Sequence, residues 1–206
     1  MNDRLERALT HTAHEWTPDP PDISAAAARA GLLDVAYATV DSPVGRLLLA
    51  RTPRGLVRVA YVPPDGEDAV LEALAGKLSP RVIAAPRALD EARRELDEYF
   101  AGARTRFELP LDWHLIRGFG RRVLEATARV PYGAVSTYKQ VAAQAGNARA
   151  SRAAGNALGS NPMPIVVPCH RVLNTGGGLG GYTGGLERKR LLLAIERGQP
   201  VLEGLG

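Results

Sequence analysis

Hydrophobic residues follow two patterns in the first half of the chain. Three runs rich in β-branched and aromatic residues span 35–40, 46–50 and 56–62, and turn residues separate them. This pattern predicts three strands of an antiparallel meander. The segments 67–78 and 89–100 instead carry apolar residues at helical spacing. A further edge strand is predicted at residues 106, 107, 108 and 109.

The second half of the chain is predicted to be mainly helical. Apolar residues at 119, 123 and 124 share one face of a helix that ends before the turn at 131–133. Thr137 is a favourable N-cap for a short helix that Gly146 ends. A second helix is predicted over 149–158. A short helix, a glycine-containing turn and a second helix form the outline of a helix-turn-helix.

These patterns divide the chain into three parts. Residues 1–33 form an N-terminal extension, in which short helices are predicted over 3–16 and 25–30. Residues 34–112 form an α/β domain, and residues 113–206 form a C-terminal domain that closes with a helix over 186–196. The extension contains His11 and His14 but no third ligand and no cysteine, so we expect no metal there.

Charge is distributed unevenly between these parts. Residues 113–206 contain 12 basic and four acidic residues, whereas the rest of the chain contains 14 basic and 18 acidic residues. No acidic residue occurs between Glu125 and Glu187. A polyanion that contacted this half would meet no carboxylate in that window, and counterion release would favour its binding. An arginine-rich composition combined with chance is the simpler explanation, and charge alone does not decide between the two.

The predicted second helix combines small residues with cations. Arg149, Arg152 and Asn156 fall on one face at positions i, i+3 and i+7, and alanine, serine and glycine fill the positions between them. Small side chains allow a helix to approach a groove closely. Close packing between helices would also explain the alanines, but it would not explain the basic stripe.

The run from Ile165 to Val172 contains Cys169, the single cysteine of the chain. A β-branched stretch leads into a Pro-Cys-His-Arg turn, and the thiolate form of cysteine is a nucleophile. We expect His170 and Arg171 to lower the pKa of the thiol. His170 is also a candidate base, and Glu196, at the end of an apolar helical run, is either its buried partner or a solvated helix end.

A family resemblance rests on several segments of the second half. They are Val130-Pro-Tyr-Gly133, Tyr138, Gly146-Asn147, Arg152-Ala-Ala-Gly155, Asn161-Pro-Met-Pro-Ile-Val-Val-Pro-Cys-His-Arg-Val172, Gly181-Tyr-Thr-Gly-Gly-Leu186, Lys189, Leu192 and Glu196. Together they resemble the signature of the O6-alkylguanine-DNA alkyltransferases, also called methylated-DNA–protein-cysteine methyltransferases. The resemblance covers nearly all of 117–198. Residues 34–112 resemble the N-terminal domain of that family only in size and order of elements.

The resemblance implies an α+β fold of two domains: a ribonuclease H-like N-terminal α/β domain and a mainly helical C-terminal domain with a winged helix-turn-helix. It implies DNA repair, in which the protein binds double-stranded DNA containing O6-alkylguanine and flips the damaged base into a pocket. The alkyl group then passes irreversibly to a cysteine, so that each molecule acts once. O4-alkylthymine as a second substrate and cooperative binding along DNA stay open.

Carried over residue by residue, the resemblance assigns roles in the chemistry. Cys169 is the acceptor, and His170 and Glu196 complete its activating network. Tyr138 donates a proton to the leaving guanine, and Asn161 ties the turn before the active-site strand.

The same resemblance assigns contacts with DNA and with the flipped base. Arg152 would enter the base stack in place of the extruded guanine, where a planar guanidinium can stack. Further DNA contacts are expected from Tyr138, Arg149, Ala153, Gly155, Asn156 and Arg171. The pocket residues are expected to be Val172, Tyr182, Thr183, Gly184 and Lys189.

Two other functions are compatible with a lone cysteine in a basic domain. A binder or sensor of alkylated DNA that performs no chemistry is the main alternative, and a cysteine hydrolase is the second. One cysteine cannot supply the zinc ligands of some family members, and no cofactor is expected. No apolar run approaches about 18 residues and no signal peptide is seen, so we expect a cytoplasmic protein without membrane contact. We also expect a monomer in solution.

Overall fold

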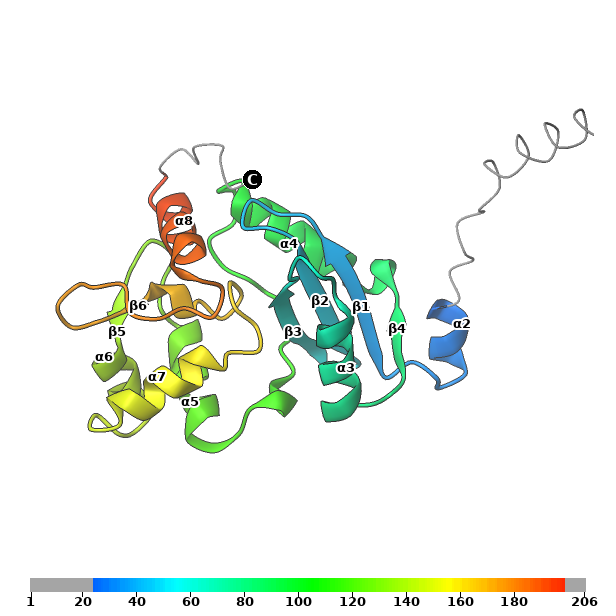
Figure 1. Ribbon diagram of the computed structural model, residues 1–206, viewed down its shortest axis with the longest axis horizontal. Coiled ribbons are helices and arrows are strands. Elements are labelled where there is room, and N and C mark those ends of the chain that lie inside the picture. The colour runs from blue at the N-terminus through cyan, green and yellow to red at the C-terminus, as the bar shows by residue number, and fades with distance from the viewer. Residues whose placement is uncertain (1–23, 199–206) are drawn as a thin grey trace, which may run out of the picture.

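The structure, a computed structural model, describes residues 24–198. A four-stranded sheet with helices forms the N-terminal part, and a group of short helices forms the C-terminal part (Figure 1). Among the described residues, no helix has the length and apolar character needed to cross a membrane. The helix predicted over 3–16, His11 and His14 lie outside the described residues.

A mixed sheet forms the centre of the N-terminal part. Its strands are β1 (Val35–Val40), β2 (Leu47–Thr52), β3 (Gly55–Tyr61) and β4 (Val82–Ala84), in the order β3-β2-β1-β4. The first three pair antiparallel, which confirms the predicted meander, and β4 pairs parallel with β1. The sequence does not predict β4, because three residues are too few to show a periodic pattern.

Helices cover both faces of this sheet. On one face α3 (Asp68–Lys77) buries Leu74 against Leu48 of β2. On the other face, α4 (Asp90–Phe100) follows the 3-10 turn η1 (Pro86–Leu89) and buries Leu96 and Tyr99. Both long helices were predicted from their apolar spacing and are confirmed. The short helix α2 (Ser24–Arg29), also predicted, lies beyond β4, at the end of the sheet far from the C-terminal part (Figure 1).

The C-terminal part is built from short helices and one small strand pair. In chain order they are η2 (Trp113–Leu115), α5 (Gly118–Ala128), β5 (Ser136–Thr137), α6 (Tyr138–Gln144), α7 (Ser151–Gly159), η3 (Cys169–Arg171), β6 (Val172–Leu173) and α8 (Leu186–Glu196). Thr137 caps α6 as predicted, because its Oγ1 accepts from the Gln140 N–H at 3.2 Å. Gly146, with a φ of 94°, then ends the turn after α6.

The two parts share one hydrophobic core. A single buried cluster joins Leu96 and Tyr99 of α4 to Leu124 of α5 and to Met163 and Ile165. Hydrogen bonds also cross between the parts, because Val59 of the outer strand β3 donates its N–H to the Pro162 carbonyl at 2.9 Å. The edge of the sheet is therefore covered by the C-terminal part, and the two parts form one packed unit.

The edge strand predicted at residues 106–109 is wrong. Side chains bind two backbone groups of this segment, since Arg104 donates to the Arg106 carbonyl and Glu95 accepts from the Glu108 N–H, both at 2.9 Å. The nearest sheet contact is an isolated bridge between Leu111 and Leu56.

The start predicted for the second helix of the helix-turn-helix is also wrong. Helix α7 begins at Ser151, two residues later than expected. The side chain of Asn147 accepts a hydrogen bond from the Arg149 N–H at 3.1 Å, which closes a turn that competes with helical bonding. Arg149 therefore lies in the turn before α7 and does not share a helix face with Arg152 and Asn156.

Candidate active site

The segment before Cys169 is a buried loop that Asn161 holds in place. The Asn161 amide nitrogen donates to the Val167 carbonyl at 2.8 Å, and its oxygen accepts from the Met163 N–H at 3.0 Å. Ile165 has a φ of 74°, a left-handed conformation that β-branched residues rarely adopt. The active-site strand implied by the resemblance is therefore replaced by tight turns, with the strained residue four positions before Cys169.

Cys169 begins the 3-10 turn η3 and is 5% exposed. Asn161 also donates to its Sγ at 3.2 Å. Burial raises the pKa of the Cys169 thiol to about 11, although the Asn161 hydrogen bond and the charge of Lys189 act in the opposite direction. The expected net lowering of this pKa by His170 and Arg171 is therefore wrong for the resting site, because burial outweighs the hydrogen bond from the His170 backbone. A thiol of this kind needs a base to accept its proton before it can attack.

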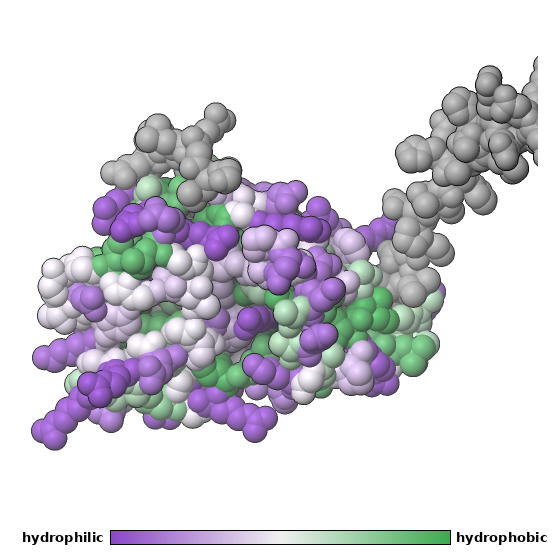
Figure 2. All heavy atoms as spheres, in the orientation of Figure 1, coloured by the Kyte–Doolittle hydropathy of each residue, from purple (hydrophilic) through white to green (hydrophobic). Residues whose placement is uncertain are grey.

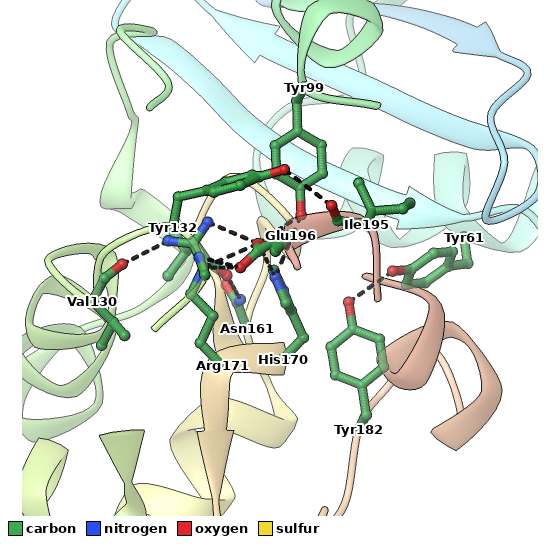
Figure 3. A network of polar contacts seen from close by, with 12 residues as sticks. Tyr61, Tyr99, Val130, Tyr132, Asn161, His170, Arg171, Tyr182, Ile195 and Glu196 are labelled. Atoms are coloured by element: carbon green, nitrogen blue, oxygen red, sulfur yellow. Dashed lines mark hydrogen bonds and ion pairs between the residues drawn. The ribbon is translucent and has the colours of Figure 1, made fainter. Parts of the chain in front are cut away.

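Glu196, at the end of α8, is the centre of a buried polar network (Figure 3). Its Oε1 lies 2.7 Å from His170 Nε2, and Arg171 donates from Nε to both carboxylate oxygens at 3.0 and 2.9 Å. The Gly133 N–H donates to Oε2 at 3.1 Å. Burial by itself would raise the pKa of Glu196, but the hydrogen bonds from His170 and Arg171 lower it to about 2. Glu196 is thus the buried partner of His170, one of the two alternatives left open by the sequence.

His170 is fully buried, and the contacts of its two ring nitrogens differ. Because Nε2 faces the Glu196 carboxylate, we assign the ring proton to Nε2. Nδ1 is the one buried side-chain nitrogen or oxygen without a hydrogen-bond partner in the part of the chain described. Burial lowers the pKa of His170, against the opposing effect of Glu196. The ring is therefore a neutral imidazole with a free lone pair on Nδ1.

Arg171 has a structural role, and its side chain offers no exposed cation for the predicted contact with DNA. The side chain is buried, and besides binding Glu196 it donates from Nη1 to the Val130 carbonyl at 2.6 Å. Its guanidinium also lies over the Tyr132 ring, 5.8 Å from the centroid. A cation consumed by these contacts cannot reach a phosphate.

Tyr99 is a residue of the network that the sequence does not single out. It comes from α4 in the N-terminal part, and its hydroxyl donates to Glu196 Oε1 at 2.7 Å. Its sequence signal is an aromatic residue on the apolar face of a helix, which is an ordinary core position. The partner lies 97 positions away along the chain, so no local pattern could have connected the two.

Lys189 lies fully buried near Cys169, as expected. Its Nζ donates to the carbonyls of Val172, at 2.8 Å, and of Leu179. Burial lowers the pKa of Lys189 to about 8, although the nearby Cys169 raises it. Lys189 therefore ties the chain between β6 and the glycine-rich loop to α8, and the buried backbone of Val172 forms part of this attachment.

The predicted pocket residues Tyr182, Thr183 and Gly184 follow the glycine-rich loop. The Tyr182 hydroxyl shares a 2.7 Å hydrogen bond with the Tyr61 hydroxyl of β3, and the Tyr182 ring meets the His170 ring edge to face at 6.4 Å. Thr183 donates to the Gly159 carbonyl at 2.7 Å, which attaches this segment to the end of α7. Gly184 is buried against the rings of Tyr61 and Tyr182, so a side chain would not fit there.

Tyr138 is the first residue of α6 and lies between two glycines. A Cβ added at Gly180 would lie 2.5 Å from its hydroxyl oxygen, and one added at Gly155 would lie 3.8 Å from its ring. Burial raises the pKa of Tyr138, so the hydroxyl keeps its proton at neutral pH. The glycines leave room for this hydroxyl beside the loop that leads to Tyr182.

The helix-turn-helix presents part of the predicted DNA-contact set to solvent. Arg152, Ala153 and Asn156 are exposed on α7, and Gly155 is half-buried. Arg149 is also exposed, from the turn before the helix. Hydrophilic side chains project from the end of the molecule where α6 and α7 lie (Figure 2). Within residues 24–198, no group of three or more histidine, cysteine, aspartate or glutamate side chains is placed to hold a metal ion.

Comparison with known proteins gives one match in each part of the chain. Residues 35–113 match the family described as 6-O-methylguanine DNA methyltransferase, ribonuclease-like domain, and residues 118–198 match the DNA binding domain of that family. These matches confirm the predicted two-domain α+β fold class.

Individual relatives agree with this match. A methylated-DNA–protein-cysteine methyltransferase of Mycolicibacterium paratuberculosis is 43% identical over 79% of this chain and 93% of its own length. The constitutive enzyme of that name from Bacillus subtilis is 37% identical over 78% and 94%. The crystal structure of Mycobacterium tuberculosis OGT in complex with DNA is 38% identical and covers 80% of this chain and 95% of its own, with a TM-score of 0.67. The chain belongs to the 6-O-methylguanine DNA methyltransferase family.

Proposed function

We propose that this protein repairs DNA by moving the alkyl group of O6-alkylguanine irreversibly onto its own Cys169. The observation that supports this most strongly is the buried hydrogen bond between His170 Nε2 and Glu196, which leaves Nδ1 free on the residue directly after the buried Cys169. We call His170 and Glu196 the relay. A cysteine that served only to pack the core would not need an oriented imidazole and an ionised carboxylate next to it.

The relay suits a thiol that stays protonated at rest. The Cys169 proton passes to the free Nδ1 of His170, either directly or through a bridging water, and Glu196 stabilises the imidazolium that forms. The sulfur then forms a bond to the alkyl carbon as the bond from that carbon to O6 breaks. A resting pKa of about 11 protects the thiol from oxidation and side reactions until the substrate and the base are in place.

Tyr138 supports departure of the guanine. Expelling guanine as an anion is unfavourable, and a hydroxyl that donates a proton lowers the barrier. The raised pKa of Tyr138 keeps that proton available at neutral pH. The proton held by His170 then replaces it, so the net reaction transfers the thiol proton to guanine. The thioether on Cys169 is stable, and the protein is consumed in one reaction.

DNA binding is proposed for the exposed face of α7. The alkyl carbon is hidden inside the duplex, so the base must leave the stack at a cost of a few kcal/mol. Arg152 is exposed on a helix of small residues and can fill the vacated space, while Ala153, Gly155 and Asn156 allow close approach. Tyr182, Thr183 and Gly184 are proposed to line the pocket for the flipped base.

One chain supplies every part of this site, so we propose that the protein acts as a monomer.

We also propose the division into an extension (1–33), an N-terminal domain (34–112) and a C-terminal domain (113–206). A reducing cytoplasm would suit a single thiol that must not oxidise.

Single-turnover repair of a defined duplex tests the function. A duplex with one O6-methylguanine is mixed with increasing protein, and the conversion of the lesion to guanine is measured by digestion and chromatography. We expect conversion to rise linearly and to end at one lesion per protein molecule. A binder of alkylated DNA would leave the lesion unchanged at every ratio, and a catalyst that turns over would exceed one lesion per molecule.

A further inference from the structure

Two tyrosines of the N-terminal part reach residues of the candidate active site (Figure 3). Tyr61 contacts Tyr182 at the pocket, and Tyr99 contacts Glu196 in the relay. The second contact concerns the chemistry directly, because Tyr99 binds the same carboxylate oxygen, Oε1, that faces His170. The Tyr99 hydroxyl also lies 3.5 Å from His170 Nε2.

The position of the Tyr99 hydroxyl is fixed by packing. The ring is completely buried, and three aromatic rings surround it, with centroids at 5.3 Å for Phe100, 5.3 Å for Phe107 and 5.9 Å for Tyr132. Burial and the neighbouring Glu196 raise the pKa of Tyr99, so the hydroxyl stays protonated and donates to the carboxylate. A hydroxyl held this rigidly defines where Oε1 lies.

We propose that Tyr99 is a positioning residue for alkyl transfer, which holds Glu196 Oε1 in line with His170 Nε2 and limits the pull of the carboxylate on the imidazole proton. His170 then keeps the neutral form whose Nδ1 can accept the proton of Cys169. This inference rests on the proposed function. It assigns part of the chemistry to the N-terminal part, which carries no catalytic sequence signature.

The charges around His170 set the direction of the effect. Glu196 favours the imidazolium, whereas the cations Arg171 and Lys189 disfavour it, and burial adds to that disfavour. Tyr132, Cys169 and Tyr182, whose ring meets the His170 ring, are the other titratable groups on neighbouring segments. Removal of the Tyr99 hydroxyl leaves the cations in place but returns negative charge to Oε1, because one hydrogen bond to the carboxylate is lost. The imidazolium becomes more favourable, and the pKa of His170 rises toward its ordinary value.

The matched variants are Tyr99→Phe and Tyr37→Phe. The phenylalanine at 99 keeps the aromatic packing and removes one hydroxyl. Tyr37 lies on β1 and packs with the cluster of Leu48 and Leu74 on the opposite face of the sheet, so its variant makes the same chemical change away from the relay. The single-turnover rate of methyl transfer from an O6-methylguanine duplex is measured from about pH 5 to about pH 9, together with DNA affinity.

We expect the acid limb of the Tyr99→Phe profile to move to higher pH, with a loss of up to about fourfold near pH 6 and almost none near pH 8.5. DNA affinity and the Tyr37→Phe profile should match the unchanged protein. In a Glu196→Gln background, Tyr99→Phe should cause no further shift, because the carboxylate it acts through is absent. An equal loss at every pH, or an unmoved acid limb, overturns the inference.

A second readout separates this inference from the proposed function. The side-chain nitrogen signals of His170 are titrated by NMR in the protein without DNA, where no transfer occurs. We expect the His170 pKa to be higher in Tyr99→Phe than in the unchanged protein, and equal pKa values would contradict the inference. If the unchanged protein transferred no methyl group at all, the proposed function would fail, whatever the NMR titration showed.

Discussion

The two parts of the molecule differ in how easily their functional residues can be recognised from the sequence. The C-terminal part carries Cys169 and His170 in one contiguous motif, and Glu196 closes the helix that follows. The N-terminal part shows only strand and helix patterns, yet it supplies Tyr99 to the relay and Tyr61 to the pocket. A segment that reads as scaffold can therefore place side chains in an active site, because packing across a shared core brings distant residues together.

We expect the largest loss of methyl transfer from a substitution in the C-terminal motif. Cys169→Ser should reduce methyl transfer by about a thousandfold or more, because a serine hydroxyl is a far weaker nucleophile at neutral pH. Binding to the alkylated duplex should remain, since the substitution is nearly isosteric. Single-turnover transfer and a DNA-binding titration check the two expectations. Substantial transfer by this variant would remove Cys169 from its proposed role.

The next largest effect is expected at Glu196, which binds Arg171 and also meets Tyr99 of the N-terminal part. Glu196→Gln leaves the buried Arg171 without its carboxylate, which costs about 3–5 kcal/mol of unfolding free energy. Glu187→Gln is the matched control, because that exposed carboxylate also sits on α8 and pairs with Arg190. It should change the unfolding free energy by less than about 0.5 kcal/mol. Urea unfolding measures both, and equal effects would mean that the buried pair of Glu196 and Arg171 does not stabilise the fold.

Acid should weaken the same contact in a defined window. The pKa of Glu196 falls from 4.5 to about 2 in the folded protein. The unfolded chain therefore binds the proton more readily, so stability is fully present above about pH 5 and is lost as pH falls toward about 2. The contribution is about 3 kcal/mol. Unfolding curves from pH 6 downward should show this loss, and Glu196→Gln should lack it. A variant with the same acid dependence would assign the effect to other carboxylates.

A smaller effect on repair is expected on the exposed face of the C-terminal part. Arg152→Ala should slow repair of duplex DNA by about ten- to a hundredfold, since the vacated base position loses its stacking guanidinium. Reaction with free O6-alkylguanine base should be unchanged, because no flipping is needed. Arg190→Ala removes an exposed charge from α8 and serves as the control for net charge. Equal losses on duplex and free base would contradict a role in flipping.

The smallest effect is expected at the other contact between the parts. Tyr61→Phe removes one hydroxyl from the pair with Tyr182 and should cost about 1 kcal/mol of unfolding free energy. The pH dependence of transfer should not move, in contrast with Tyr99→Phe. Thermal or urea unfolding and the transfer profile provide the measurement. A shifted acid limb in Tyr61→Phe would show that loosening the interface anywhere disturbs the relay.

Local signals account for what the sequence predicts correctly. The capped helix α6 begins where Thr137 indicates, and Glu196 lies at the end of the apolar run of α8. Non-local contacts account for what the sequence does not show. Arg171 looks like a free cation in the sequence, but its partner lies 25 positions further along, and the partner of Tyr99 lies 97 positions away.

Competing hydrogen bonds from side chains explain two further differences. The side chain of Asn147 accepts a hydrogen bond from the Arg149 N–H, which keeps Arg149 out of α7. The Glu95 carboxylate accepts from the Glu108 N–H, a backbone group that an edge strand would need for pairing. The thiol pKa also differs from expectation, because basic neighbours in sequence suggest a thiolate whereas burial of Cys169 dominates. Burial depends on the whole fold, so adjacent residues could not reveal it.

The most direct test of the account is the mass of the intact protein after reaction with a duplex that carries one O6-methylguanine. We predict the addition of a single methyl group, located on Cys169 by peptide mapping, with no second addition when the duplex is in excess. An unchanged mass while the duplex remains bound would contradict the account, and so would a methyl group on any residue other than Cys169.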